Sequence, residues 1–353
     1  MTMGMEKLAF SAAQTARIGW FFGQKMLAAR MGRPVAVPEA LRRRPMPDRR
    51  RILADLRGLI EQDWRNIEAG YYAPPAGELA NPLKELRRAV DFFTDLNAVE
   101  RRRHGGNKER LLTAPLGRYP RYYLQKFHFQ SDGYLSSASA ERYDHQVEVL
   151  FGGGAAAMRR QALVPLKAAL VQGTAAGRNA ARLLDVGCGT GRFLREVKTN
   201  YPRLHVTGLD LSPHYLAVAK RALAPWSRVR LVEGAAETMP FGDAEFDIVT
   251  CVYLFHELPP RIRRSVAGEI SRVLRPGGTL VFVDSLQTGD EPDYDALLDL
   301  FPLAFHEPYY ASYLQEDFDR LWSPGFTRAG ALPAYFSKVL SFRRDPDKIA
   351  SKI

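Results

Sequence analysis

The sequence predicts an α/β protein in which helices cover both faces of a mostly parallel sheet, preceded by a mostly helical region. Two observations support this prediction. From residue 182 onward, strand-like apolar runs alternate with helix-like segments, and the buried run 183–186 breaks into a glycine loop at 187–191. Before that point the patterns are helical. We therefore expect an N-terminal domain over residues 1–150 and an α/β domain over residues 151–353.

The first domain is expected to consist of helices. Residues 8–29 space apolar side chains at roughly helical intervals but include Arg17 and Lys25, so an amphipathic helix is favoured over a signal peptide. Such a helix docks on its own core or lies on a membrane surface, and both alternatives stay open. Further helical segments are predicted over 47–70, 83–103 and 141–171, with breakers at 74–75, 105–106 and 152–154.

In the second domain, strands and helices are expected to alternate. The predicted strands are 182–186, 204–209, 228–232, 246–252 and 278–284, with a last pair near 326–331 and 335–342.

The glycine loop indicates a site for a nucleotide cofactor. Gly187, Gly189 and Gly191 let the backbone turn sharply and approach a ligand, and the following helix offers free N–H groups. The loop does not match a dinucleotide-binding fingerprint, because Arg192 stands where the third glycine of that fingerprint would be. It does not match a Walker loop either, because no Gly-Lys-Ser/Thr follows. Asp210 follows the second strand, a position suited to a ribose diol.

Over residues 181–344 the chain resembles the class I S-adenosylmethionine (SAM)-dependent methyltransferases, in the branch of the ubiquinone and menaquinone biosynthesis enzymes. The matching runs are LDVGCGTG (184–191), GLDLS (208–212), GAAETMPF (234–241), FDIV (246–249) and VLRPGG (273–278). The resemblance implies a Rossmann-like seven-stranded sheet, SAM as cofactor and S-adenosylhomocysteine as product. The first motif would face the methionine part, Asp210 the ribose, and Ala236 with Glu237 the adenine.

Further site residues complete the prediction. The expected cofactor contacts are Asp185, Gly187, Cys188, Gly189, Gly191, Asp210, Leu211, Ala236, Glu237, Tyr253 and, from the segment before the α/β domain, Tyr143. His256, just beyond the fourth strand, is the candidate general base; packing at a strand end is the equally weighted alternative, and Glu257 either orients the ring or faces water. The candidate substrate contacts are His128, Tyr134, His306, Tyr309 and Tyr310.

Charge is distributed unevenly over the 353 residues. Residues 1–180 hold 29 Lys+Arg and 17 Asp+Glu, so the first half carries the whole basic excess of a chain with net charge +11. A basic surface of this kind can bind nucleic acid, an anionic membrane or an acidic substrate. The alternative is that its arginines are only solvated. With two cysteines, no disulfide framework and no metal site are expected, and a cytoplasmic setting is favoured.

Three functions remain open at this stage. The preferred one is methylation of oxygen or carbon on a small aromatic, quinone-like or polyketide-like molecule. The alternatives are an RNA methyltransferase that uses the basic N-terminal half, and a non-catalytic SAM-binding adaptor. Nucleic acid is disfavoured because residues 252–255 lack the Asn/Asp-Pro-Pro-aromatic motif. Peripheral membrane contact through the N-terminal helix and a homodimer stay open.

Overall fold

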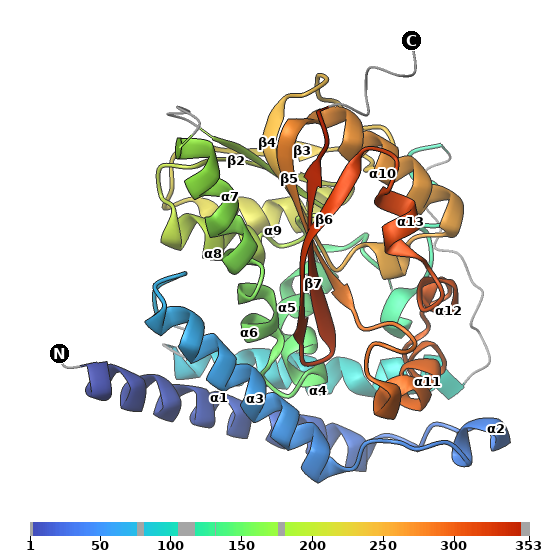
Figure 1. The fold of residues 1–353 in the computed structure, drawn as a ribbon. Coiled ribbons are helices and arrows are strands. Elements are labelled where there is room, and N and C mark those ends of the chain that lie inside the picture. The colour runs from blue at the N-terminus through green and yellow to red at the C-terminus, as the bar shows by residue number, and fades with distance from the viewer. Residues whose placement is uncertain (1–2, 76–80, 105–116, 131, 176–180, 347–353) are drawn as a thin grey trace. The chain divides into compact units, whose positions relative to one another are not determined.

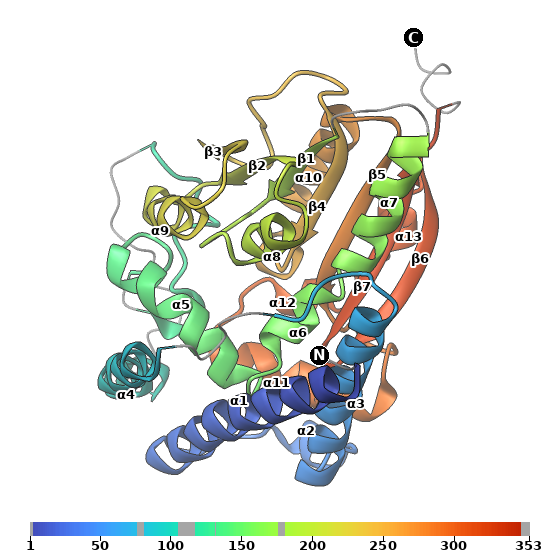
Figure 2. The same ribbon diagram turned by 90° about the vertical axis from the view of Figure 1, so that its left-hand side faces the viewer.

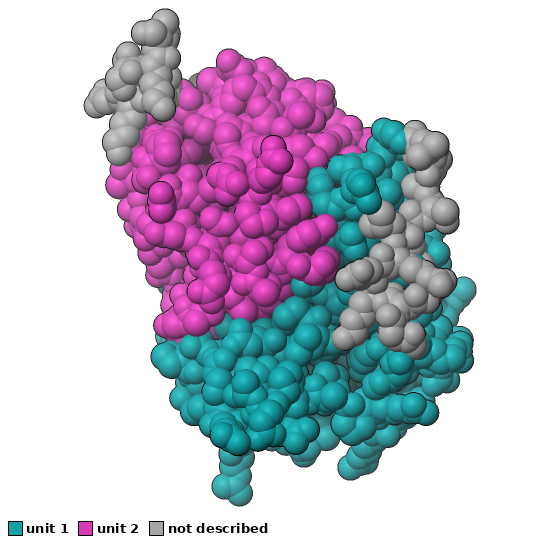
Figure 3. All heavy atoms as spheres, turned by 90° about the vertical axis from the view of Figure 1, so that its right-hand side faces the viewer, with its two compact units in different colours: residues 1–158, 292–307 teal, residues 159–291, 308–353 magenta. Residues whose placement is uncertain are grey.

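The chain forms two compact units, and each of them combines two segments of the sequence. The computed structural model describes residues 3–75, 81–104, 117–130, 132–175 and 181–346. Unit 1 comprises residues 1–158 and 292–307, and unit 2 comprises residues 159–291 and 308–353 (Figure 3). A short segment from the second half of the chain therefore belongs to the first unit.

Unit 2 is built on a sheet that has seven strands over the described part of the chain, in the order β3-β2-β1-β4-β5-β7-β6 (Figures 1 and 2). The strands are β1 (Arg182–Val186), β2 (His205–Asp210), β3 (Val229–Glu233), β4 (Phe246–Val252), β5 (Leu274–Ser285), β6 (Phe326–Ala334) and β7 (Ser337–Arg344). Strands β1 to β5 pair in parallel, whereas β7 is antiparallel to both β5 and β6. The mostly parallel sheet predicted from the sequence is confirmed.

The centre of the sheet is buried on both faces. Leu183, Leu184 and Val186 of β1 have no exposed surface, as expected for a parallel strand covered by helices. β1 pairs with β2 on one side and with β4 on the other. The strand order therefore reverses beside β1, and in open α/β sheets ligands bind in the crevice at the carboxyl ends of the strands at such a point.

Helices cover both faces of this sheet (Figure 2). On one face lie α7 (Leu163–Ala175), α8 (Arg192–Asn200) and α9 (Pro213–Leu223), and on the other lie α10 (Pro260–Val273) and α13 (Phe318–Trp322). Two short elements, η2 (Phe255–Glu257) and α12 (Tyr310–Tyr313), follow β4 and precede α13. Local sequence explains where α9 begins, because Ser212 accepts a hydrogen bond from the Tyr215 N–H and Pro213 occupies the first turn.

Unit 1 is helical. Its elements are α1 (Met3–Met31), α2 (Glu39–Arg42), α3 (Arg49–Glu68), α4 (Pro82–His104), η1 (Phe127–Phe129), α5 (Ser137–Leu150), η3 (Pro292–Tyr294) and α11 (Asp295–Phe305), and α6 (Ala155–Arg160) crosses into unit 2. Asp48 caps α3 and Ser136 caps α5, each by accepting a backbone N–H of the first turn. α11 joins this unit through Tyr294, whose hydroxyl donates to Asp55 at 2.7 Å.

Helix α1 confirms the predicted N-terminal helix but buries only part of the predicted apolar set, with Phe21 3% exposed. Leu8, expected on the apolar face, is 71% exposed, whereas Arg17 is 2% exposed. Arg17 is buried because its guanidinium pairs with Glu148 of α5 at 2.7 Å and donates to the Gly153 carbonyl at 3.0 Å. The buried face of α1 therefore combines this long-range ion pair with the apolar Phe10 and Phe21.

Two other element boundaries differ from the prediction. The helical segment expected over 141–171 is interrupted at the predicted breaker 152–154, where Gly152 and Gly153 adopt positive φ, and a second break that the sequence did not predict separates α6 from α7. The predicted breaker at 105–106 lies outside the described residues. Strand β5 begins at Leu274, before the predicted residue 278, because Leu274 pairs with Phe246 of β4 ahead of the Pro-Gly-Gly turn.

Among the described residues, no helix is both long and apolar enough to cross a bilayer.

Candidate active site

The glycine loop links the end of β1 to the start of α8. Gly187, Gly189 and Gly191 have φ values of 72°, 54° and 76°, in the left-handed region that favours glycine. The N–H groups of Gly187 and Cys188 both donate to the Leu209 carbonyl at 2.9 Å, which fastens the loop to β2. Gly191 then serves as the N-cap of α8.

The three glycines have different surroundings. A Cβ on Gly191 would lie 3.0 Å from the Ala219 Cβ, and a Cβ on Gly187 would lie 3.2 Å from the Leu254 side chain, so both positions are closely packed. A Cβ on Gly189 would meet only Tyr215, at 4.0 Å. The loop is therefore open at Gly189, where a nucleotide cofactor can approach the backbone.

Two carboxyl groups lie beside this loop. Asp210 accepts hydrogen bonds from the Gly189 and Ser212 N–H groups, each at 2.8 Å, and it uses a different oxygen for each. A carboxylate oxygen accepts two hydrogen bonds, so Asp210 retains acceptor capacity for a ribose diol. Asp185 is buried at the end of β1 and accepts from the Thr250 hydroxyl at 2.6 Å.

Burial perturbs the titration of both carboxyl groups. It raises the pKa of Asp185 to about 7 and that of Asp210 to about 6. Burial, followed by the two nearby carboxylates, also raises the pKa of the Cys188 thiol well above its usual value, so this thiol is neutral. Cys188 can line the loop, but it is not a nucleophile at neutral pH.

The other predicted cofactor contacts lie at neighbouring strand ends. Leu211 follows β2, and Ala236 and Glu237 form a half-buried turn between β3 and β4. Tyr253 follows β4 with φ of 57°, and its hydroxyl bonds the Ser337 hydroxyl at 2.8 Å. Unit 2 thus brings together all the predicted cofactor contacts except Tyr143, which belongs to unit 1.

His256 is paired with an aspartate. Its Nδ1 lies 2.6 Å from Asp284 Oδ1, and the Asp284 side chain is fully buried at the end of β5. Asp284 is held in turn by the N–H groups of Phe255 and Ser285, each at 2.8 Å. This arrangement orients Nε2 as the ring nitrogen that accepts a proton. Glu257 lies 3.9 Å from Nε2, so Asp284, rather than Glu257, orients the ring.

Aromatic side chains from α12 border this pair. The rings of Tyr310 and Tyr313 approach the His256 imidazole edge-on, at 6.0 and 6.1 Å between centroids. The fully buried Arg263 holds the segment in place: it donates to the Tyr309 and Ser312 carbonyls at 3.2 and 3.1 Å and pairs with Glu316. Of the predicted substrate contacts in unit 2, Tyr310 contacts His256, whereas Tyr309 contributes its backbone carbonyl to Arg263.

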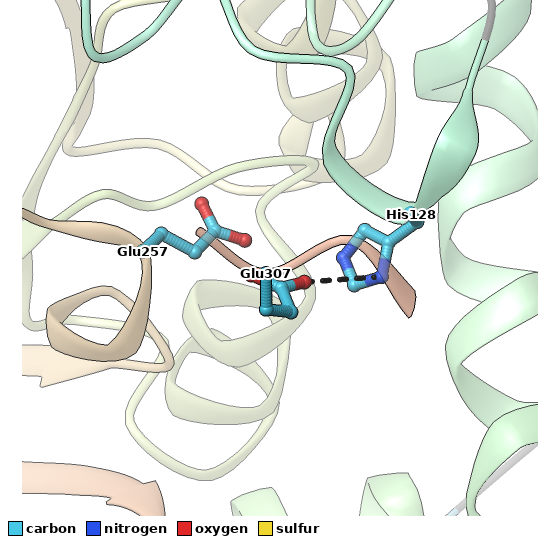
Figure 4. A group of neighbouring side chains, drawn as sticks. All are labelled: His128, Glu257 and Glu307. Carbon is cyan, nitrogen blue, oxygen red and sulfur yellow. Dashed lines mark ion pairs between the residues drawn. The ribbon is translucent and has the colours of Figure 1, made fainter. Parts of the chain in front are cut away.

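The predicted contacts in unit 1 gather around η1. His128 and Phe129 both have positive φ, near 55°, which is uncommon for non-glycine residues. His128 Nδ1 lies 3.3 Å from a Glu307 carboxylate oxygen (Figure 4). The ring centroids of His306 and Phe129 are 5.5 Å apart, and those of Tyr134 and Tyr143 are 6.1 Å apart.

Asp284 and Arg263 are the functional candidates missing from the sequence prediction. Asp284 carries the same signal as Asp210, an acid at the carboxyl end of a predicted strand. Its importance becomes visible only when β5 pairs with β4 and brings it beside His256. Arg263 gives no such signal, because arginines on a helix are normally exposed.

Comparison with known proteins identifies the domain. Residues 183–278 match the family model described as a methyltransferase domain. The fold, the glycine loop and this match define the second unit as a class I SAM-dependent methyltransferase domain, with SAM as its cofactor.

Two curated relatives are demethylmenaquinone methyltransferases. The one from Deinococcus radiodurans is 35% identical over 151 residues, which is 42% of this chain and 58% of the relative. The one from Staphylococcus aureus is 37% identical over 111 residues, which is 31% of this chain and 45% of the relative. The chain thus spans about half the length of these relatives. A solved putative methyltransferase from Bacillus halodurans is 21% identical and covers 50% of this chain and 98% of its own, with a TM-score of 0.38.

Proposed function

We propose that this protein transfers the methyl group of SAM to oxygen or carbon of a small, aromatic or quinone-like molecule. The observation that carries the proposal is the pairing of His256 with the buried Asp284 at the carboxyl ends of β4 and β5. Leu254, two residues before His256, packs against Gly187 of the glycine loop. The base and the candidate cofactor loop therefore lie at the same edge of the sheet.

Within the proposed site the residues have distinct tasks. The loop at 187–191 and Asp210 bind the cofactor, which supplies an electrophilic methyl group when bound. Asp284 accepts the Nδ1–H of His256, so that Nε2 removes the proton of a phenolic or enolic acceptor. The resulting imidazolium is stabilised by the Asp284 carboxylate, and the buried rings of Tyr310 and Tyr313 keep water from the histidine.

The class of acceptor follows from the aromatic border of the site. Tyr310 and Tyr313 present flat, largely apolar surfaces to His256, and flat rings pack well against such surfaces. The two curated relatives are named for demethylmenaquinone, which also supports a quinone-like acceptor. Deprotonation by a histidine suits oxygen or activated carbon nucleophiles, which must lose a proton to accept the methyl group.

The proposal is tested by following the label from methyl-labelled SAM. Purified protein is incubated with the labelled cofactor and a cell extract, and label is counted in solvent-extracted, RNA and protein fractions. We expect label in the solvent-extracted fraction, together with formation of S-adenosylhomocysteine. Label confined to RNA would contradict a small-molecule acceptor, and absence of S-adenosylhomocysteine would indicate a non-catalytic adaptor.

The His256→Ala variant tests the proposed base. Removing a general base costs roughly 100-fold or more in turnover, whereas SAM does not need the imidazole to bind. We therefore expect turnover to fall at least about tenfold while the dissociation constant for SAM stays within about twofold. The matched control is His205→Ala, which removes an exposed histidine at the start of β2 in the same unit. Equal turnover of His256→Ala and wild type would remove the base assignment.

Ion pairing within unit 1 argues against RNA as the acceptor. Arg44 pairs with Asp299, and Arg51 pairs with both Asp55 and Asp293, at 2.7 and 3.2 Å. These acids compensate part of the positive charge that the arginine clusters suggest in the sequence. Phosphate binding depends on such charge, so its partial neutralisation supports the small-molecule alternative.

A further inference from the structure

Unit 1 contains a partly open cavity of about 290 Å³ whose lining includes His128 and Tyr143, a predicted substrate contact and a predicted cofactor contact. It lies among α1, α4 and α5, which contact one another in pairs, and residues of η1 and α11 complete the lining. Every lining residue belongs to unit 1. The volume is near the lower limit of about 300 Å³ for small-molecule pockets in proteins.

Most of the cavity wall is apolar. Phe92, Leu96 and Val99 line it from α4, Val147 lines it from α5, and Phe305 lines it from α11. These side chains cannot satisfy a polar ligand, but they favour a hydrocarbon chain or ring through the hydrophobic effect.

Among the described residues, Lys25 is the part-buried cation of the wall that has no ion pair with an acid, whereas Arg33 is exposed. Lys25 of α1 donates a hydrogen bond to the Leu150 carbonyl at 2.8 Å, and within the described part of the chain no carboxylate lies within 4.0 Å of its Nζ. An ammonium carries three donors, so Lys25 can bind a further acceptor. Burial lowers the pKa of Lys25 to about 8, which still leaves it mostly charged at pH 7.

The acids that line the cavity are already paired with arginines. Glu100 lies 2.6 Å from Arg103, and Asp95 lies 3.7 Å from Arg142. Arg103 also stacks over the Phe305 ring, at 5.8 Å from its centroid. Because Arg103 is paired and Arg33 is exposed to solvent, Lys25 is the lining cation best placed to compensate a negative charge brought by a ligand.

We propose that this cavity binds a small apolar carboxylic acid, with its hydrocarbon part among the side chains of α4 and α5 and its carboxylate against Lys25. A carboxylate there completes the ion pair that Lys25 lacks, in surroundings of low dielectric constant where charge-assisted hydrogen bonds are strong. The inference concerns unit 1 alone and does not depend on methyl transfer in unit 2.

The test compares two probes that share a hydrocarbon chain and differ in the head group. Octanoate and 1-octanol are titrated into the full-length protein at pH 7, and binding is measured by calorimetry. We expect octanoate to bind at least about tenfold more tightly than 1-octanol, because only octanoate carries the negative charge. No octanoate binding up to about 1 mM, or equal affinity for the two probes, would overturn the proposal.

Three variants connect the binding to this cavity. Lys25→Met keeps the aliphatic stem, so the preference for octanoate should disappear while 1-octanol binds as before. Ala28→Phe places a ring in the cavity and should weaken both probes. Lys7→Met removes an exposed lysine of the same helix and should change neither. Unchanged octanoate affinity in either cavity variant, with circular dichroism showing a native fold, would contradict the assignment.

Discussion

The carboxyl groups of Asp185 and Asp210 give the candidate cofactor site a built-in pH dependence. Burial raises their pKa values to about 7 and about 6, so both are largely ionised only above neutrality. SAM presents hydroxyl donors and positive charge, which favour carboxylates over neutral acids. Protonation of these groups should therefore weaken cofactor binding.

We predict that the affinity for SAM falls about tenfold as the pH decreases from 7.5 to 5, because both groups become protonated over this range. Calorimetric titrations at several pH values measure the effect. An Asp210→Asn variant should bind more weakly and show a shallower dependence. Affinity that does not change with pH would show that these carboxyl groups do not contact the cofactor.

Protonation of Asp185 and Asp210 stabilises the folded protein, although it should weaken SAM binding. Between about pH 4 and pH 7 the native protein binds more protons at Asp185 and Asp210 than the unfolded chain does. Their contribution to the free energy of unfolding is therefore full below about pH 4 and is lost as the pH rises through the folded pKa values.

Single residues differ in how far the sequence alone could identify them. Asp210 was predicted because its role depends on a local order of strand, acid and turn. Asp284 was not, because its partner His256 is 28 residues away and the two meet only through the pairing of β4 with β5. Strand ends that carry acids are the signal that would have identified both.

At the scale of the element, the glycine loop combines packing with binding. Gly191 lies against α9, whereas a Cβ on Gly189 would meet only Tyr215, at 4.0 Å. A side chain at each position strains the left-handed backbone by about 1–2 kcal/mol, but only at Gly191 does it also collide with a helix.

We predict that Gly191→Ala and Gly189→Ala separate these two effects. Gly191→Ala should lower the free energy of unfolding by about 2–5 kcal/mol, the sum of backbone strain and overpacking against α9. Gly189→Ala should lower the free energy of unfolding only by the backbone strain of about 1–2 kcal/mol. The accompanying loss of binding free energy for SAM should be larger than this loss of stability. Thermal unfolding and calorimetric titration of both variants measure the two quantities. Equal losses of stability would contradict the distinction.

Elements with a strong local pattern were predicted with near-correct bounds. β1 and β4 begin and end at the predicted residues, because buried runs between breakers define them. Helix α1 was predicted as a helix, but its buried face was predicted only in part. That face includes Arg17, whose partner Glu148 of α5 is 131 positions further along the sequence.

For the whole molecule, the division into two units suggests two separate binding functions. The candidate cofactor loop belongs to unit 2, and the cavity beside Lys25 belongs to unit 1. A ligand stabilises the native structure that it contacts, by about 2.7 kcal/mol at 100 times its dissociation constant. Each ligand should therefore protect the amides of its own unit.

We predict that hydrogen exchange distinguishes the two units. Saturating S-adenosylhomocysteine should slow exchange in residues 183–210, whereas octanoate should slow it in α1 and α4. Mass spectrometry of peptides from the same sample measures both regions, and α3 serves as an internal control. Protection of the same peptides by both ligands would show that the two share one site.

Local patterns were enough to predict an alternating α/β domain, a glycine loop that accepts a nucleotide cofactor, and a helical region before it, because backbone propensity and apolar spacing act over a few neighbouring residues. Long-range packing decided the rest. It paired His256 with Asp284, buried Arg17 against Glu148, moved residues 292–307 into unit 1, and formed a cavity lined by residues as far apart as Lys25 and Phe305. These features depend on which elements become neighbours in three dimensions, and the periodicity of apolar residues along the chain does not determine which elements those are.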